Sequence, residues 1–255
     1  MTDFDFNVFS WNEPPFTGLS VQASDCFEKL VFLLHGYMGD AESNLAFAEK
    51  LAARVPNARI VVPDGLMPIP AYNDSHRRQW WELDERFNGN SLAGFSNDAS
   101  DFDYALTQTL VPKIHFSAGV LNRFVVNTAA KCGKTLSDCA VAGISQGGMT
   151  AFEMVLFRKE LSRIQNPLGA LIIIGAGIVK AERLSSVPSL PPIPVLLAGG
   201  NQDEIFPPEV NDFSEKILKE KGLPVSRIQT NSVHYGLEHS TDEAVGEFLN
   251  KIWKK

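Results

Sequence analysis

The sequence predicts an α/β fold in which a mainly parallel β-sheet is covered by helices on both faces. Short, continuously apolar runs, which are typical of strands buried on both sides, alternate along the chain with longer segments that have helical spacing. The 255 residues, 44% of them hydrophobic, suffice for a substantial core, and no repeat or low-complexity linker divides them. We therefore expect one domain over residues 1–255.

The individual elements follow from these runs. Five buried strands are predicted at 30–34, 59–62, 139–142, 170–174 and 195–198, and a last strand at 227–233. Helices are predicted at 41–54, 106–125, 149–156 and 244–252, where apolar residues recur every three or four positions. Proline lacks a backbone N–H, so we expect Pro112 to kink or split the second of these helices.

Charge and composition argue against several classes of protein. The net charge of -7 would repel a polyanion, so we expect no nucleic acid partner. No apolar run reaches the ~20 residues of a membrane span, and no basic and apolar leader is present at the start of the chain. Cys26, Cys132 and Cys139 lack CxxC spacing and suit free thiols in a reducing compartment, which predicts a cytoplasmic protein.

The segment Gly143-Ile144-Ser145-Gln146-Gly147 joins a predicted strand to a predicted helix and has the GxSxG pattern of a nucleophile elbow. A serine on such a sharp turn has a strained backbone, and glycines two positions away avoid a collision with it. The start of the following helix offers N–H groups and a positive dipole end to an oxyanion beside Ser145. This context predicts Ser145 as the nucleophile of an α/β-hydrolase fold.

A second loop of the predicted site begins at His35-Gly36, directly after the strand 30–34. An α/β-hydrolase takes its second oxyanion N–H from a loop at this place, and Gly36 lets the backbone approach the substrate carbonyl. Either Tyr37 or Met38 would donate that N–H. The alternative is an ordinary glycine turn in which His35 has a structural role.

The acid of the predicted triad follows the strand 195–198, because this fold has the chain order Ser, Asp or Glu, His. Asp203 and Glu204 are both candidates, and the alternative is a pair of solvated acids in a turn. We favour Asp203 because the apolar residues 205–207 indicate that the chain turns back into the protein immediately afterwards.

Two of the five histidines, His234 and His239, come after this acid in the chain. His234 lies at the end of the last predicted strand, whereas His239 lies in the loop beyond it, which Gly236 allows to bend back over the strand ends. We therefore predict His239 as the general base and keep His234 as the alternative. No HxH or HExxH spacing occurs, so we expect neither a metal nor a cofactor.

Together these motifs resemble the phospholipase/carboxylesterase group of α/β-hydrolases, which includes the acyl-protein thioesterases. Four blocks match in order, namely Leu34-His35-Gly36, residues 143–148, Asp203 with Phe206-Pro207, and Gly236-Leu237-Glu238-His239-Ser240. The resemblance implies Ser145, Asp203 and His239 as the triad and Tyr37 and Gln146 as the oxyanion donors. The sequence departs from the family pattern at Ala198-Gly199-Gly200, at Phe206, and in an extended segment 87–101.

The segment 66–100 contains aromatic residues among many turn formers, and aromatic side chains are seldom left bare on a monomer. Residues 78–80 also resemble the tryptophan segment near the cleft of bacterial family members. We expect the segment to form a cap over the site, with Trp80, Trp81 and Met38 in contact with substrate. The alternative is that the tryptophans belong to a local core.

These expectations combine into one predicted function, a serine hydrolase that cleaves ester or thioester bonds through an acyl-enzyme. Its substrate would be a small-molecule ester, a lysophospholipid or an acyl thioester. One alternative is a binding module that keeps the fold without catalysis, since fold alone does not determine function. The other is a hydrolase of another bond, either a peptidase or a carbon–carbon hydrolase.

Overall fold

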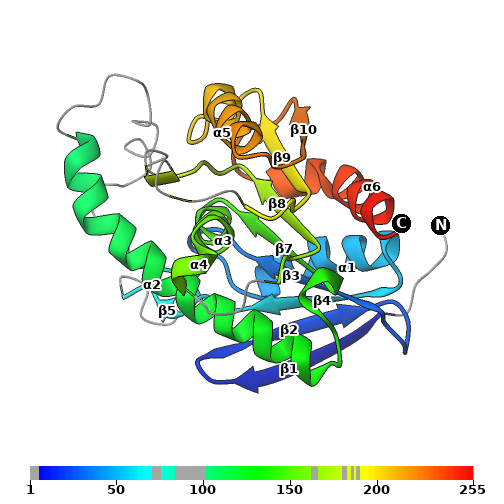
Figure 1. The fold of residues 1–255 in the computed structure, drawn as a ribbon. Coiled ribbons are helices and arrows are strands. Elements are labelled where there is room, and N and C mark those ends of the chain that lie inside the picture. Colours follow the sequence, from blue (N-terminus) through cyan, green and yellow to red (C-terminus); the bar gives the residue numbers. More distant parts are fainter. Residues whose placement is uncertain are drawn as a thin grey trace.

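The computed structural model describes residues 6–70, 76–83, 102–161, 166–179, 183–184, 187 and 190–254. The strands of its main sheet are β1 (Asn7–Glu13), β2 (Phe16–Gln22), β3 (Lys29–Leu34), β4 (Ala58–Pro63), β7 (Cys139–Ile144), β8 (Ala170–Ile174), β9 (Val195–Gly200) and β10 (Val225–Thr230). They form one eight-stranded sheet with the order β1-β2-β4-β3-β7-β8-β9-β10, shown in Figure 1. A separate short pair consists of β5 (Met67–Pro68) and β6 (Arg78–Gln79).

The predicted strands are all present, and β3 to β10 in the main sheet pair in parallel. The two N-terminal strands were not predicted. They pair antiparallel with each other, and β2 also pairs antiparallel with β4. β1 lies at the edge of the sheet and is largely exposed, so its sequence lacks the continuous apolar run that marks a buried strand.

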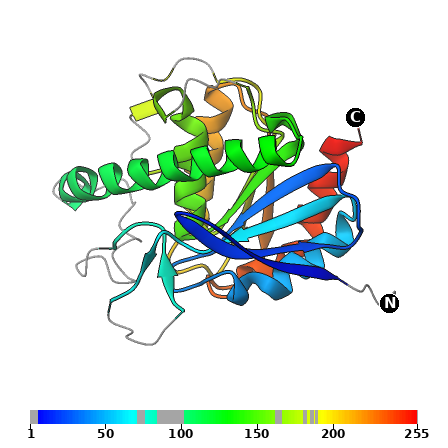
Figure 2. The ribbon, with the colours of Figure 1, turned by 90° about the horizontal axis from the view of Figure 1, so that it is seen from below.

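Helices cover both faces of this sheet, as predicted. One face carries α1 (Leu45–Arg54) and α6 (Asp242–Trp253), and the other carries α2 (Phe102–Lys131), α3 (Gln146–Leu156) and α5 (Pro208–Glu220). Figure 2 shows α2, in green, and α6, in red, on opposite sides of the sheet. The remaining helical elements are short: η1 (Glu42–Asn44), η4 (Leu136–Asp138), α4 (Arg158–Leu161) and η6 (Leu237–Ser240).

Alternation along the strands assigns side chains to two separate cores. In β3, Val31 and Leu33 belong to the core beneath α1 and α6, whereas Leu30, Phe32 and Leu34 belong to the core beneath α2, α3 and α5. Because side chains of a strand point to opposite faces in turn, a strand buried on both sides must be apolar throughout. This requirement explains why the central strands are continuous apolar runs.

Helix α2 continues through Pro112 as a single element, so of the expected kink or split the split is absent. Proline inside a helix removes one hydrogen bond and costs about 3 kcal/mol. Leu110 and Ile114, on either side of Pro112, are buried in the same core as Leu121. Burial of this continuous apolar face offsets the local cost.

The parallel register brings several loops to one edge of the sheet. Leu34 of β3 pairs with Gly143 of β7, and Ile174 of β8 pairs with both Ile144 and Ala198. The segments that follow β3, β7 and β9 therefore leave the sheet at the same edge, where ligands of open α/β sheets usually bind. The candidate site is built from these segments and from the loop after β10.

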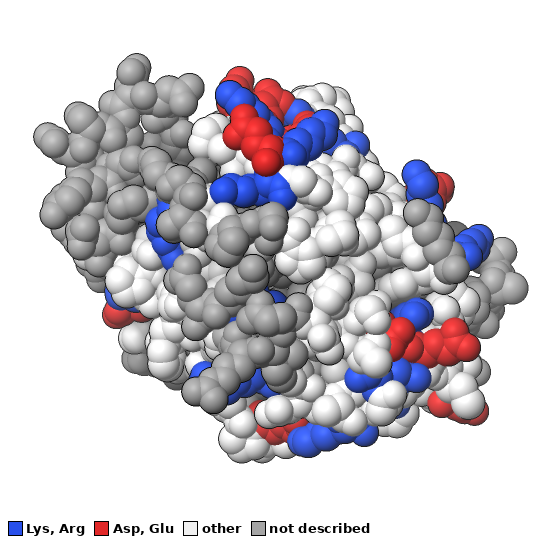
Figure 3. Space-filling view, viewed as in Figure 1, with Lys and Arg blue, Asp and Glu red and all other residues white. Residues whose placement is uncertain are grey.

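Charged side chains of both signs are intermixed on the face shown in Figure 3. Over α5, Lys219 pairs with Glu215 and Arg227 pairs with Asp212. Within the described part of the chain, no helix combines the length and the apolar character that crossing a membrane requires.

Candidate active site

Ser145 stands on the sharp turn between β7 and α3 that its motif predicts. Its backbone has φ 51° and ψ -117°, a strained conformation for a residue with a side chain. A Cβ at position 143 would lie 2.5 Å from the carbonyl oxygen of Gly147, and one at position 147 would lie 2.6 Å from that of His35. Only glycine fits at both positions, so the two glycines allow the turn that raises Ser145 above the sheet.

Three side chains from different loops form a hydrogen-bonded chain at this turn. The Nε2 atom of His234 lies 3.0 Å from the Oγ atom of Ser145, and its Nδ1 atom lies 2.9 Å from Oδ2 of Asp203. The side chains of His234 and Asp203 are only 7% and 0% exposed. A nucleophile, an imidazole and a buried carboxylate in this order are the arrangement of a serine hydrolase triad.

The Asp203 carboxylate is held by the chain that follows it. Its Oδ1 atom accepts the backbone N–H groups of Ile205 and Phe206 at 2.9 and 2.7 Å. These bonds leave Oδ2 directed at His234. Glu204, the other acidic candidate, is exposed. The structure thus brings Asp203 to the site, in the way that the return of the chain at 205–207 suggested.

The structure does not bring His239 to the site, which corrects the choice between the two histidines. The imidazole of His239 is 50% exposed, and its Nε2 atom lies 3.6 Å from Oε1 of Glu238. Strand β10 ends at Thr230, three residues before the predicted end, so His234 already lies in the loop above the strand ends. The polar residues Asn231 and Ser232, directly after β10, are the sequence signal for this earlier end.

The loop 35–39 lies beside Ser145, as expected for the oxyanion loop. A Cβ on Gly36 would lie 3.4 Å from the Cβ atom of Ser145. The N–H of Met38 donates to the carbonyl of Arg78 at 3.1 Å, so this N–H is already engaged within the protein. On the other side of Ser145, the N–H of Gln146 is the first of α3 and has no helical acceptor four residues earlier. Tyr37 and Gln146 remain the predicted oxyanion donors.

His35, the first residue of this loop, is buried, and its ring orients the peptide that follows it. Its Nε2 atom accepts the N–H of Gly65 at 2.7 Å, so the proton of the neutral ring is on Nδ1, which lies 2.7 Å from the carbonyl oxygen of Gly36. Burial lowers the pKa of His35 and keeps the ring neutral. Because the carbonyl of Gly36 and the N–H of Tyr37 share one planar peptide, this bond also sets the direction of the Tyr37 N–H.

Trp80 and Trp81 lie in the core beneath the site and not in a substrate cleft, which corrects the expectation for both. They are 0% and 1% exposed. The indole N–H of Trp80 donates to the carbonyl of His35, and that of Trp81 to the Oγ1 atom of Thr150. Each indole N–H finds a partner inside the protein, as a buried tryptophan requires. Contact of Met38 with substrate remains a prediction. Most of the predicted cap, namely residues 71–75 and 84–100, lies outside the described residues.

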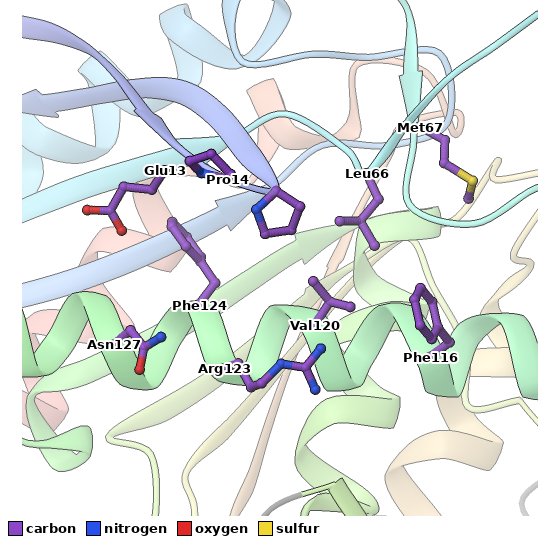
Figure 4. Close-up of a pocket in the computed structure, with 10 residues that line it drawn as sticks. Glu13, Pro14, Leu66, Met67, Phe116, Val120, Arg123, Phe124 and Asn127 are labelled. Atoms are coloured by element: carbon purple, nitrogen blue, oxygen red, sulfur yellow. The ribbon is translucent and has the colours of Figure 1, made fainter.

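The pocket in Figure 4 lies between α2 and the turn that joins β1 to β2. Its volume is about 430 Å³, and Pro14, Leu66, Phe116 and Val120 are among its lining residues. Ser145, His234 and Asp203 are not. In the described ranges, no cluster of three or more His, Cys, Asp or Glu side chains could hold a metal ion.

Residues 20–253 match the phospholipase/carboxylesterase family. The chain belongs to this family. It is therefore a hydrolase that acts on ester bonds, and the resemblance drawn from its motifs is confirmed.

Solved structures share the fold of this phospholipase/carboxylesterase family member at low sequence identity. Esterase PE8 has a TM-score of 0.75 at 22% identity, over 93% of this chain and 99% of its own. Arabidopsis thaliana SOBER1 has a TM-score of 0.67 at 16% identity, over 88% and 99%. A Bacillus cereus carboxylesterase has a TM-score of 0.68 at 16% identity, over 94% and 95%. No curated protein matches the sequence.

Proposed function

We propose that the chain is a serine esterase in which Ser145, His234 and Asp203 form the catalytic triad. The observation that carries this proposal is the pair of hydrogen-bond distances, 3.0 Å from Ser145 to His234 and 2.9 Å from His234 to Asp203. Nε2 of His234 accepts the proton of Ser145 as its Oγ attacks the acyl carbonyl, and the Asp203 carboxylate stabilises the resulting imidazolium. His234 is thus proposed as the general base in place of His239, which the sequence had predicted for this role.

The tetrahedral intermediate carries its negative charge on the former carbonyl oxygen. The backbone N–H groups of Tyr37 and Gln146 donate to this oxygen, and the positive end of the α3 dipole lies on the same side. When the intermediate collapses, His234 returns the proton to the leaving oxygen or sulfur, and the acyl group stays on Ser145. A water molecule, deprotonated by His234, then attacks the acyl-enzyme and releases the carboxylic acid.

The proposed substrate is a small carboxylic ester, with an acyl thioester or a lysophospholipid as the finer possibilities within the family. The names of the neighbours with this fold, an esterase, a carboxylesterase and SOBER1, support the ester.

We also propose a cytoplasmic location, because Cys26, Cys132 and Cys139 are all free thiols. A nucleic acid partner is not part of the proposal, since the chain has a net charge of -7.

A fluorophosphonate probe tests the nucleophile directly, because it reacts covalently with activated serines. We expect labelling of the wild-type protein on Ser145 and no labelling of Ser145→Ala. A panel of p-nitrophenyl esters and acyl thioesters of increasing chain length then identifies the acyl preference. An unlabelled and inactive wild-type protein would contradict the triad and favour a binding module on the same fold.

A further inference from the structure

The two proposed oxyanion donors come from separate parts of the chain. Tyr37 follows β3, whereas Gln146 begins α3 after β7. Stabilisation of an oxyanion requires both N–H groups within hydrogen-bond reach of one oxygen, so the separation of the loop and the helix start must be held closely. The contacts that can hold this separation lie in the core beneath the two segments.

Trp80 contacts both elements at once. Its indole N–H donates to the carbonyl oxygen of His35 at 2.8 Å, directly before the Gly36-Tyr37 peptide. Its backbone N–H donates to the Oε1 atom of Gln146 at 2.8 Å. The carbonyl of Trp80 in turn accepts the hydroxyl of Ser117, on α2, at 2.8 Å. One residue thus joins the oxyanion loop to the elbow and ties both to the neighbouring helix.

The surroundings of Trp80 leave it little freedom. Its ring lies 5.1 Å from the ring of His35 and 6.2 Å from that of Phe16, and none of its surface is exposed. The side chain of Gln146 also donates to the carbonyl of Trp81 at 2.9 Å. Its amide group is therefore hydrogen-bonded to the backbone of both residue 80 and residue 81. A buried hydrogen-bond network whose members are all satisfied holds its partners in one arrangement.

The carbonyl oxygen of His35 is also a contact point with the elbow itself, since a Cβ at Gly147 would lie 2.6 Å from it. Loss of the indole N–H would leave this buried oxygen without its donor and free the His35-Gly36 peptide to rotate. We infer that Trp80 is a positioning residue that sets the separation of the Tyr37 and Gln146 N–H groups. This inference rests on the proposed function.

The chain contains a matched control in the next residue. Trp81 is also buried, and its indole N–H donates to Thr150 at 3.2 Å, on α3 itself. Trp80→Phe and Trp81→Phe therefore each remove one buried indole hydrogen bond and a similar volume. Only Trp80→Phe removes a bond to the oxyanion loop.

We expect Trp80→Phe to lower kcat by about tenfold to a hundredfold with KM within about twofold, because misplaced donors weaken transition-state binding alone. Trp81→Phe should keep kcat within about twofold, with a similar loss of Tm. Phenylboronic acid forms a tetrahedral adduct on the serine with an oxygen in the oxyanion position. In Trp80→Phe, but not in Trp81→Phe, the affinity of the enzyme for phenylboronic acid should fall by the same factor as kcat/KM.

If Trp80→Phe does not fold, Gln146→Met provides the second test. This variant keeps the N–H of residue 146 but removes the side-chain bonds to residues 80 and 81, and we expect the same selective loss of kcat. Equal kcat values for Trp80→Phe and Trp81→Phe in an active enzyme would overturn this inference alone. An inactive wild-type protein would overturn the proposed function and this inference together.

Discussion

The elbow at 143–147 and the histidine loop at 231–241 each supply one side chain to the Ser145–His234 hydrogen bond, but the two regions differ in how closely their sequences are constrained. At the elbow, glycines 143 and 147 are required by contacts of 2.5 and 2.6 Å that any Cβ would make. In the histidine loop, His234 and His239 stand five residues apart, and both positions accept a histidine. A position where only glycine fits can be recognised in the local sequence. Which of two loop histidines contacts Ser145 depends on the path of the loop, which the local sequence does not show.

The largest expected effect tests the elbow. Ser145→Ala should lower kcat by about 10⁴-fold or more, since triad members act as a unit, while the unfolding transition stays close to wild type. Steady-state hydrolysis of a p-nitrophenyl ester and a thermal melt measure the two quantities. A purified variant with a tenth of the wild-type activity would contradict the mechanism.

The next effect tests the histidine loop. His234→Ala should lower kcat by about 10³-fold to 10⁴-fold, because no other base lies beside Ser145 in the described part of the chain. His239→Ala should stay within about threefold of wild type, since an exposed side chain outside the site contributes little. The reverse ranking would return the general base to His239 and contradict the geometry of the loop.

Glycine replacements compare the two regions directly. Gly147→Ala should destabilise the fold by about 2 kcal/mol or more and reduce kcat, because its Cβ would collide with the backbone of the oxyanion loop. Gly236→Ala should cost only about 1 kcal/mol, because the nearest atom to its Cβ is 3.9 Å away and only its φ of 81° is unfavourable. Denaturant unfolding measures both, and equal losses would show that the elbow has room to relax.

The smallest expected effect is a pH dependence of the free energy of unfolding that arises from His35, next to the elbow. Burial lowers the pKa of His35, so the unfolded chain binds a proton more readily than the folded one. The stability from the neutral ring is therefore present above the unfolded value of about 6.5 and is lost as the pH falls through and below it. The free energy of unfolding should fall more between pH 8 and pH 5.5 in the wild type than in His35→Gln. Parallel pH curves would show that His35 does not contribute.

Several elements illustrate how far the sequence carries the fold. The central strands were predicted because burial on both faces requires unbroken apolar runs such as 170–174. The N-terminal strands β1 and β2 show no such run. β1 lies at the edge of the sheet and is largely exposed, and β2 mixes polar with apolar residues (FTGLSVQ). Of the two outcomes expected at Pro112, a kink or a split, the split does not occur, because the buried face of α2 outweighs one missing hydrogen bond. Local patterns identify elements, and packing then decides their limits.

Trp80 is the clearest case in which tertiary contacts decided a role. Its sequence neighbourhood of turn formers and aromatics favoured a cleft, and nothing local distinguishes an aromatic that lines a cleft from one that lies beneath it. Its hydrogen bonds to His35 and to Gln146 are with residues distant in the chain. Such bonds can be recognised only after the sheet has brought these segments together.

The sequence by itself determined the α/β architecture, the sharp strand-to-helix turn that carries Ser145, the loop that begins at His35 and the acidic pair Asp203 and Glu204 after the strand 195–198. These follow from rules of local geometry, namely the period of apolar residues, the steric room at a turn and the order of elements in the fold. Only the tertiary structure placed His234 instead of His239 beside Ser145 and buried Trp80 beneath the site. Both depend on distances between segments far apart in the chain, and those distances are set by strand register and loop length.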